Sequence, residues 1–184
     1  MCKSLAFGLM LAAALVAASL AQSGNLSQSG GMAAGSTSNA MSPVDKKFMT
    51  KAAAGGMAEV EMGQLAIQKA ASDDVKKFGQ RMVDDHSKAN DQLKQLAGSK
   101  GVELPSKLDA QDQATKSRLS KLSGEQFDRA YMQDMVKDHT KDVLEFQHEI
   151  KVAKDPDVKN FAAQTLPTLQ EHLSQAKTIA PKQK

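Results

Sequence analysis

The segment IQKAASDDVKKF at residues 67–78 returns as IKVAKDPDVKNF at residues 150–161. In each copy apolar residues flank a polar, Asp-containing centre, which is typical of one helix ending and the next beginning. In the second copy Asp155 can cap the new helix, and Pro156 suits its first turn, where a missing N–H is harmless. The constant offset of 83 residues therefore predicts two helical hairpins of one design.

Helical periodicity extends from both copies of the repeat. Apolar residues recur at steps of three and four from Val44 onward, and GSKGVELPSK at 98–107 breaks the pattern with two glycines and a proline. A short amphipathic helix is expected over 109–121, and SGEQ at 123–126 predicts a capping box that opens the next long helix. The sequence thus predicts an all-α, ferritin-like four-helix bundle, whose two hairpins are joined by a longer helix 2–3 crossover that carries the short helix.

The first 21 residues are typical of a secretory signal peptide. A short positive start precedes an apolar run over 5–20, and the small residues Ser19 and Ala21 stand where a signal peptidase reads. The run is short for a membrane span, although a retained anchor stays open as the alternative. Because Cys2 is the only cysteine, the mature chain has neither disulfide nor thiolate ligand. These features predict export to the periplasm or cell envelope.

Composition divides the rest of the chain into two parts. Residues 22–43 are rich in Ser, Gly, Asn and Gln and predict a disordered linker, whereas 44–180 has the length of one domain. The net charge of +3 comes from interleaved Lys and Asp, with no basic block, so nucleic-acid binding is not expected. No integral membrane span is expected after signal cleavage, and the sequence indicates no particular protein partner.

One polar residue interrupts the apolar stripe of each long helix: Glu59, His86, His139 and His172. If both hairpin turns lie at the same end of the bundle, these residues are 13, 14, 15 and 18 positions from their turns. At about 1.5 Å per residue, these distances predict a single layer at mid-bundle. The fourth histidine, His148, follows His139 by nine residues and is predicted to face solvent on the opposite side of its helix.

Two interpretations of this layer remain open. Imidazole and carboxylate groups are ligands for zinc, ferrous iron, copper or manganese, so the layer can hold a single transition-metal ion. Asp85 and Asp138, each beside a layer histidine, could then orient an imidazole on a neighbouring helix. Alternatively, a metal-free polar layer can be fully hydrogen-bonded and fix the register of the helices.

Three methionines, Met62, Met82 and Met135, lie one turn from the layer. With both turns at one end, Met62 and Met82 fall on the turn side of the layer and Met135 on the other side. We therefore expect them to fill the core separately and not to form one cluster.

Four segments carry a resemblance to a known family: GGMAEVEMGQLA (55–66), VKKFGQRMVDDH (75–86), FDRAYMQDMVKDH (127–139) and DPDVKNFAAQTLPTLQEH (155–172). Over about residues 45–178 the chain resembles the ferritin-like bacterial domain of unknown function 4142, whose members are often labelled outer membrane or exported proteins. The resemblance implies the fold and the compartment but no settled activity.

A ferritin-like fold also suggests a di-iron centre, and here the sequence departs from that pattern. Such a centre needs a Glu from each of two helices and two inward Glu-x-x-His motifs. Only Glu145 and His148 have that spacing, and His148 is predicted to face outward. No di-iron centre is expected.

The sequence favours an exported, non-catalytic domain whose Glu/His layer can hold a transition metal. The alternative is an envelope stress or interaction module with a metal-free polar core. An enzyme is not expected, because the sequence has no nucleophile elbow, phosphate loop or paired-acid signature. Hydrolysis would require a metal-activated water at the same layer.

Overall fold

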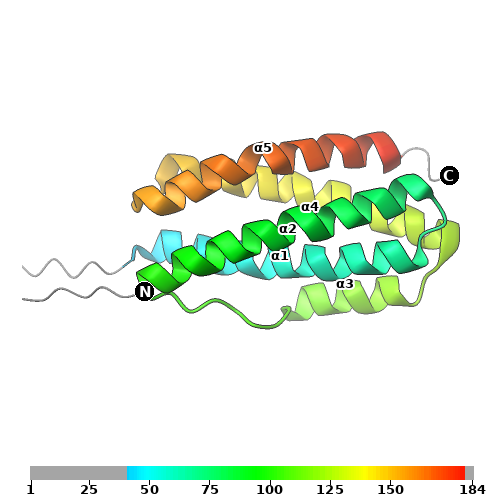
Figure 1. Ribbon diagram of the computed structural model, residues 1–184, viewed down its shortest axis with the longest axis horizontal. Helices are drawn as coiled ribbons and strands as arrows, with labels where there is room; N and C mark the ends of the chain where they lie inside the picture. Colours follow the sequence, from blue (N-terminus) through cyan, green and yellow to red (C-terminus); the bar gives the residue numbers. More distant parts are fainter. Residues whose placement is uncertain (1–40, 181–184) are drawn as a thin grey trace, which may run out of the picture. The chain divides into compact units, whose positions relative to one another are not determined.

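The computed structural model describes residues 41–180, so the predicted signal peptide and nearly all of the predicted linker lie outside it. Over this range the chain forms no strand and five helices (Figure 1): α1 (Pro43–Lys69), α2 (Asp73–Lys100), α3 (Ala110–Ser120), α4 (Gly124–Val152) and α5 (Pro156–Ile179). The all-α prediction is confirmed. None of these helices is both long and apolar enough to span a membrane.

The four long helices pack as two hairpins. α1 packs along α2 and α4 packs along α5, while further contacts join α1 to α4 and α2 to α5. The short helix α3 is the one expected over 109–121, and it lies against α1 (Figure 1). The fully buried Leu119 anchors α3, and Lys116 pairs with Glu61 of α1 at 2.6 Å.

Two glycines let α1 and α2 approach closely. A Cβ added to Gly63 would lie 2.7 Å from the carbonyl oxygen of Gly79, and one added to Gly79 would lie 2.7 Å from the Cβ of Ala66. Both distances are too short for real carbon contacts, so this crossing depends on the absence of side chains.

A buried aspartate holds each hairpin turn. Asp128, near the start of α4, accepts hydrogen bonds from the backbone N–H groups of Ala71 (3.1 Å) and Ser72 (2.8 Å) in the α1–α2 turn. Asp45, near the start of α1, accepts the equivalent bonds from Lys154 (3.0 Å) and Asp155 (2.9 Å) in the α4–α5 turn. Each hairpin therefore caps the turn of the other hairpin.

These contacts correct one prediction. Because each clasping aspartate begins the first helix of the opposite hairpin, the two turns lie at opposite ends of the domain and not at the same end (Figure 1). Asp45 and Asp128 are themselves 83 residues apart, as are the N–H groups that they bind. The repeat therefore relates the two halves of the domain by an approximate two-fold symmetry.

The helix starts agree with the sequence in one case and depart from it in another. Asp155 caps α5 by accepting from the N–H groups of Asp157 (2.8 Å) and Val158 (3.3 Å), and Pro156 follows it. Ser123 occupies the N-cap position of α4, but its side chain makes no capping bond. Gly124 enters the helix with φ 62°, a left-handed conformation, so the chain begins α4 without the predicted capping box.

The core consists of two clusters of buried residues, and each cluster contains residues of both hairpins. Phe78 and Tyr131 belong to the first cluster, and their repeat mates Phe161 and Phe48 belong to the second. The expectation that the three methionines are separate is wrong, because all of them lie in the first cluster, each 2% exposed or less: Met62, Met82 and Met135. Because the turns are at opposite ends, Met135 lies on the same side of the layer as Met62 and Met82. Their role as core filling agrees with this burial.

Candidate metal centre

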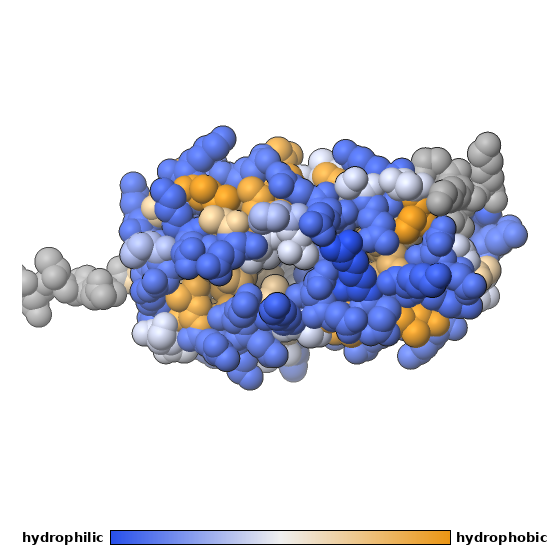
Figure 2. All heavy atoms as spheres, turned by 45° about the horizontal axis from the view of Figure 1, so that its top comes forward, coloured by the Kyte–Doolittle hydropathy of each residue, from blue (hydrophilic) through white to orange (hydrophobic). Residues whose placement is uncertain are grey.

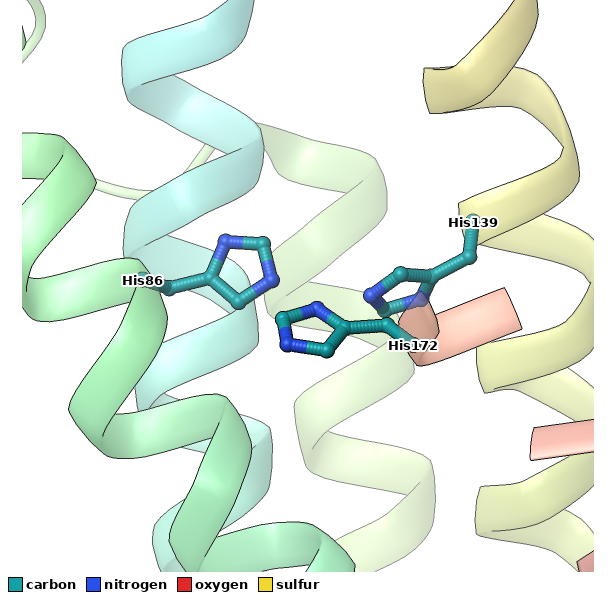
Figure 3. Close-up of side chains that lie close together, drawn as sticks. All are labelled: His86, His139 and His172. Atoms are coloured by element: carbon teal, nitrogen blue, oxygen red, sulfur yellow. The ribbon is translucent and has the colours of Figure 1, made fainter. Parts of the chain in front are cut away.

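Three of the four layer residues converge. His86 projects from α2, His139 from α4 and His172 from α5, and their rings point toward one another (Figure 3). One nitrogen from each ring lies within 4.8 Å of those of the other two. All three side chains are buried, at 7%, 0% and 1% exposure.

The histidines sit at the edge of the apolar core. Phe78 meets His139 and His172 edge-on, with ring centroids 6.4 and 6.5 Å apart. Within the trio the centroids are 5.3 to 5.7 Å apart. In so apolar a setting an imidazole nitrogen without a partner is costly, by about 1–3 kcal/mol.

Hydrogen bonds fix the tautomers of two rings. His139 donates through Nδ1 to the carbonyl oxygen of Met135 (3.0 Å), and His172 donates through Nε2 to Asp85 (2.8 Å). Asp85 also accepts from Arg81 at 3.1 Å. These bonds leave His139 Nε2 and His172 Nδ1 without a hydrogen-bond partner among the described residues, and His86 Nε2 has none either. Each ring therefore keeps a buried nitrogen whose lone pair can bind a ligand.

Burial keeps the trio uncharged. It lowers the pKa of His139 to about 3, with the charge of His172 adding to the effect. The pKa of His86 is lowered well below its ordinary value by burial and by the other two histidines. Burial also lowers the pKa of His172, although Asp85 opposes the shift. Neutral imidazole is the form that binds metals, so the centre is ready for an ion at neutral pH.

Glu59 shares the layer but stands apart from the converging nitrogens. Its Oε1 lies 3.8 Å from His139 Nδ1, the nitrogen that already donates to Met135. Its Oε2 is buried without a hydrogen-bond partner. Burial, followed by the charges of Asp142 and Asp138, raises the pKa of Glu59 well above its usual range.

The remaining predicted residues have different fates. Asp85 contacts a layer histidine on a neighbouring helix, as expected of an orienting group, whereas Asp138 makes no hydrogen bond or ion pair with a histidine in the described range. Asp138 instead lines a pocket together with residues of α1 and α3. His148 is exposed, as predicted, and its motif partner Glu145 pairs with Lys51 at 3.0 Å.

Two cavities reach the histidine layer. The larger, about 340 Å³, is lined by Glu59, His86 and further carboxylates, and we call it the acidic pocket. A smaller cavity of about 180 Å³ is lined by Asp85, His86 and His172 among others. On the face in Figure 2 the surface is mostly hydrophilic, with only separate apolar areas.

Two acids of the acidic pocket, Asp112 and Asp142, were not predicted as site residues. Burial and the charges of Asp138 and Glu145 raise the pKa of Asp142 to about 7, while Lys141 lowers it. The signal that could have identified Asp142 is the repeat, since it follows Glu59 by 83 residues. Asp112 comes from α3, outside the repeat, and no sequence pattern marks it.

Known structures share this fold. A DUF305 fragment from Deinococcus radiodurans has a TM-score of 0.69 at 15% identity, covering 77% of this chain and 98% of that one. A DUF305 protein from Streptomyces coelicolor, described as a candidate secreted protein, has a TM-score of 0.65 at 12% identity, covering 76% and 93%. CopM in its Cu(I)-bound form has a TM-score of 0.61 at 18% identity, covering 73% and 93%. At these identities the likeness establishes the fold alone.

Sequence comparison gives the family. The search of curated proteins finds no match. The family model described as a domain of unknown function, DUF4142, matches residues 30–179, which include all three converging histidines. The chain therefore belongs to the DUF4142 family, the one that its sequence resembles.

Proposed function

We propose that this protein is an exported, non-catalytic domain that binds a single transition-metal ion through His86, His139 and His172. One observation carries the proposal: three neutral imidazoles from three helices converge in the interior, and each keeps a nitrogen without a hydrogen-bond partner. Asp85 and the Met135 carbonyl hold the opposite nitrogens of two rings, which is how metal-ligating histidines are usually oriented.

This pattern favours metal over a metal-free polar layer. A layer that only set the register would use its polar atoms to bond one another, so that few remained unpaired. Here the bonds of His139 and His172 lead away from the centre, to groups outside the trio. The arrangement leaves the inward nitrogens free for an ion.

Copper is the first ion to test. Imidazole ligands suit copper and zinc, and among the related folds CopM has been solved with Cu(I), Cu(II) and silver. Metal–nitrogen bonds of about 2.0–2.1 Å require nitrogens roughly 3.4–3.6 Å apart. The three nitrogens lie within 4.8 Å of one another, so any pair wider than this spacing must close as an ion binds.

The proposal includes the compartment and the finer fold class. Residues 1–21 have the form of a signal peptide, and one structural relative is described as a candidate secreted protein. The mutual contacts of the four long helices support a ferritin-like bundle, which would carry one histidine site in place of a di-iron centre.

The test is metal binding by the mature domain, purified without a histidine tag. We expect one equivalent of copper by elemental analysis. Free metal at 100 times its Kd should stabilise the fold by about 2.7 kcal/mol and raise the melting temperature by roughly 5–10 °C. Replacing both His86 and His139 by Ala should abolish this shift, whereas His148→Ala, at an exposed histidine, should keep it.

The comparison uses the metal-dependent shift of each variant, so any loss of stability in the apo variants does not obscure it. If the wild type binds no metal and its melting temperature does not respond, the proposal is wrong. The layer is then structural, as in an envelope stress or interaction module, and His86→Leu should leave the fold at least as stable.

A further inference from the structure

We propose that the acidic pocket is a cation-binding entrance, which takes up a hydrated divalent ion through carboxylates and delivers it to the three histidines. The inference rests on the proposed function and extends it by assigning a route and a second, oxygen-donor site.

The acidic pocket has two deeply buried groups with free ligand atoms on its wall. Glu59 is 2% exposed and its Oε2 has no hydrogen-bond partner, and His86 is 7% exposed with an unpartnered Nε2. His86 also belongs to the trio, and Glu59 lies 3.8 Å from His139. The same wall therefore faces both the cavity and the histidine centre.

Charge distinguishes the acidic pocket from the smaller cavity. Two lysines face six acidic side chains on its lining: Glu59, Asp109, Asp112, Asp138, Asp142 and Glu145. The raised pKa values of Glu59 and Asp142 mean that a bound cation would favour the ionised form of both groups. One of the lysines, Lys51, is already paired with Glu145 at 3.0 Å. The smaller cavity has one acid, Asp85, and one lysine, Lys88. A concave surface with an excess of negative charge concentrates cations and speeds their association. Cations should therefore enter by the acidic pocket.

The internal repeat explains why space exists there. The repeat mates of His86, His139 and His172 are Leu169, Gly56 and Ala89, and all three mates line the acidic pocket. Small or apolar residues thus occupy the positions that the symmetry relates to the imidazoles. One half of the layer is filled by rings, and the related half is an open chamber with Asp142 in place of Glu59.

The donor atoms suit a transfer between two sites. Carboxylate oxygens hold hydrated divalent ions loosely, whereas imidazoles bind copper or zinc more tightly. An ion held among Asp112, Asp138 and Asp142 would pass Glu59 before reaching the imidazoles. Glu59 is therefore the group that spans the two sites.

The protein contains its own reporter for loading. Tyr131 is the single tyrosine, there is no tryptophan, and Phe78 contacts both Tyr131 (6.2 Å) and His139 (6.4 Å). Cu²⁺ at the centre should quench tyrosine emission. The experiment follows this quenching by stopped flow after mixing the mature domain with Cu²⁺, in wild type and in a triple variant, Asp112→Asn/Asp138→Asn/Asp142→Asn.

We expect the triple variant to load at least tenfold more slowly, with the final quenching unchanged and a weaker dependence on salt. The control removes three charges elsewhere, at exposed acids outside the acidic pocket: Asp73→Asn/Asp91→Asn/Glu103→Gln. It should load like the wild type. Calcium, compared with sodium at equal ionic strength, should slow the wild type and not the triple variant.

The outcomes separate the two proposals. An unchanged loading rate in the triple variant, with normal final quenching, overturns the entrance and leaves the histidine site standing. Absence of any copper-dependent quenching in the wild type overturns both. Far-UV circular dichroism and the final amplitude show that the triple variant is folded, so a slow rate reports access and not damage.

Discussion

A single buried acid, Glu149, makes the stability of this domain depend on pH. Glu149 is 2% exposed beside Asp45, and burial, a hydrogen bond with Asp45 and the charge of Asp45 raise its pKa to about 7 from an ordinary 4.5. The unfolded chain loses this proton near pH 4.5, while the folded chain retains it until about pH 7. Because the folded state holds this proton more tightly in that window, the contribution of Glu149 to stability falls as the pH rises through it and is level above it.

Glu149→Gln should therefore raise the melting temperature at pH 8 and have little effect at pH 4, because the amide cannot ionise beside Asp45. Thermal melts between pH 4 and pH 8 test this, with the exposed Glu103→Gln as control. An equal gain at both pH values would contradict the explanation. Asp142 contributes in the same direction and the buried histidines, with their lowered pKa values, in the opposite one, so the test compares the variant with the wild type at each pH.

The sequence could identify the candidate ligands at this scale, but not their side-chain directions. A histidine on an apolar stripe must be buried, and this rule identifies His86, His139 and His172. It also identifies Glu59, which does not join the trio. The Glu59 carboxylate approaches His139 at Nδ1, the nitrogen that donates to Met135. Asp85 and Asp138 have the same place beside a histidine, yet only Asp85 reaches a ring. Rotamers and neighbouring helices decide such differences, and spacing does not encode them.

At the scale of the helix, α1 and α2 approach each other closely at Gly63 and Gly79. Gly63→Ala should destabilise the fold by about 1–3 kcal/mol, because its methyl group would meet the backbone of Gly79 at 2.7 Å. Gly98→Ala is the matched control, since nothing lies within 4 Å of the added Cβ. It should be neutral or gain up to about 1 kcal/mol of helix propensity. Urea denaturation measures both; a loss at Gly98 equal to that at Gly63 would contradict the packing argument.

Helix ends were predictable where one residue determines them. Asp155 followed by Pro156 combines a side-chain cap with a fixed φ, and α5 begins there. The box at 123–126 has the right letters but includes Gly124, whose positive φ gives the chain another way into α4. A glycine widens the available conformations, so a motif that contains one is weaker evidence for a particular cap.

At the scale of the whole domain, the reciprocal aspartates join the two hairpins. Asp128→Ala should cost about 1–3 kcal/mol, because two turn N–H groups lose their acceptor. Asp128→Asn, which keeps one acceptor oxygen, should lose less. Chemical denaturation tests this order; wild-type stability in Asp128→Ala would show that the turn does not need the clasp.

The relative direction of the hairpins was the main feature that the sequence argument missed. The long helices have 24 to 29 residues. A residue near the middle of such a helix lies at nearly the same depth in the bundle whether the two turns are at the same end or at opposite ends. The predicted convergence of the histidines survives that error, whereas the placement of Met135 does not. Asp45 and Asp128 are also related by the offset of 83 and would have indicated the correct direction of the hairpins. Their roles are recognisable only when the turn that each one binds is known.

The reciprocal hydrogen bonds of Asp45 and Asp128 also determine which connections between the hairpins the fold requires. Each hairpin supplies the acceptor that the other lacks, so neither turn is complete in an isolated half. The stretch from Gly101 to Asp109, between α2 and α3, keeps the two hairpins close together in space. The hydrogen bonds that join the hairpins are made at the two turns and not in this stretch. If the chain were cleaved in that stretch, the two fragments could associate and form all of the aspartate–turn hydrogen bonds. Two intact molecules could likewise exchange hairpins by domain swapping and form the same bonds.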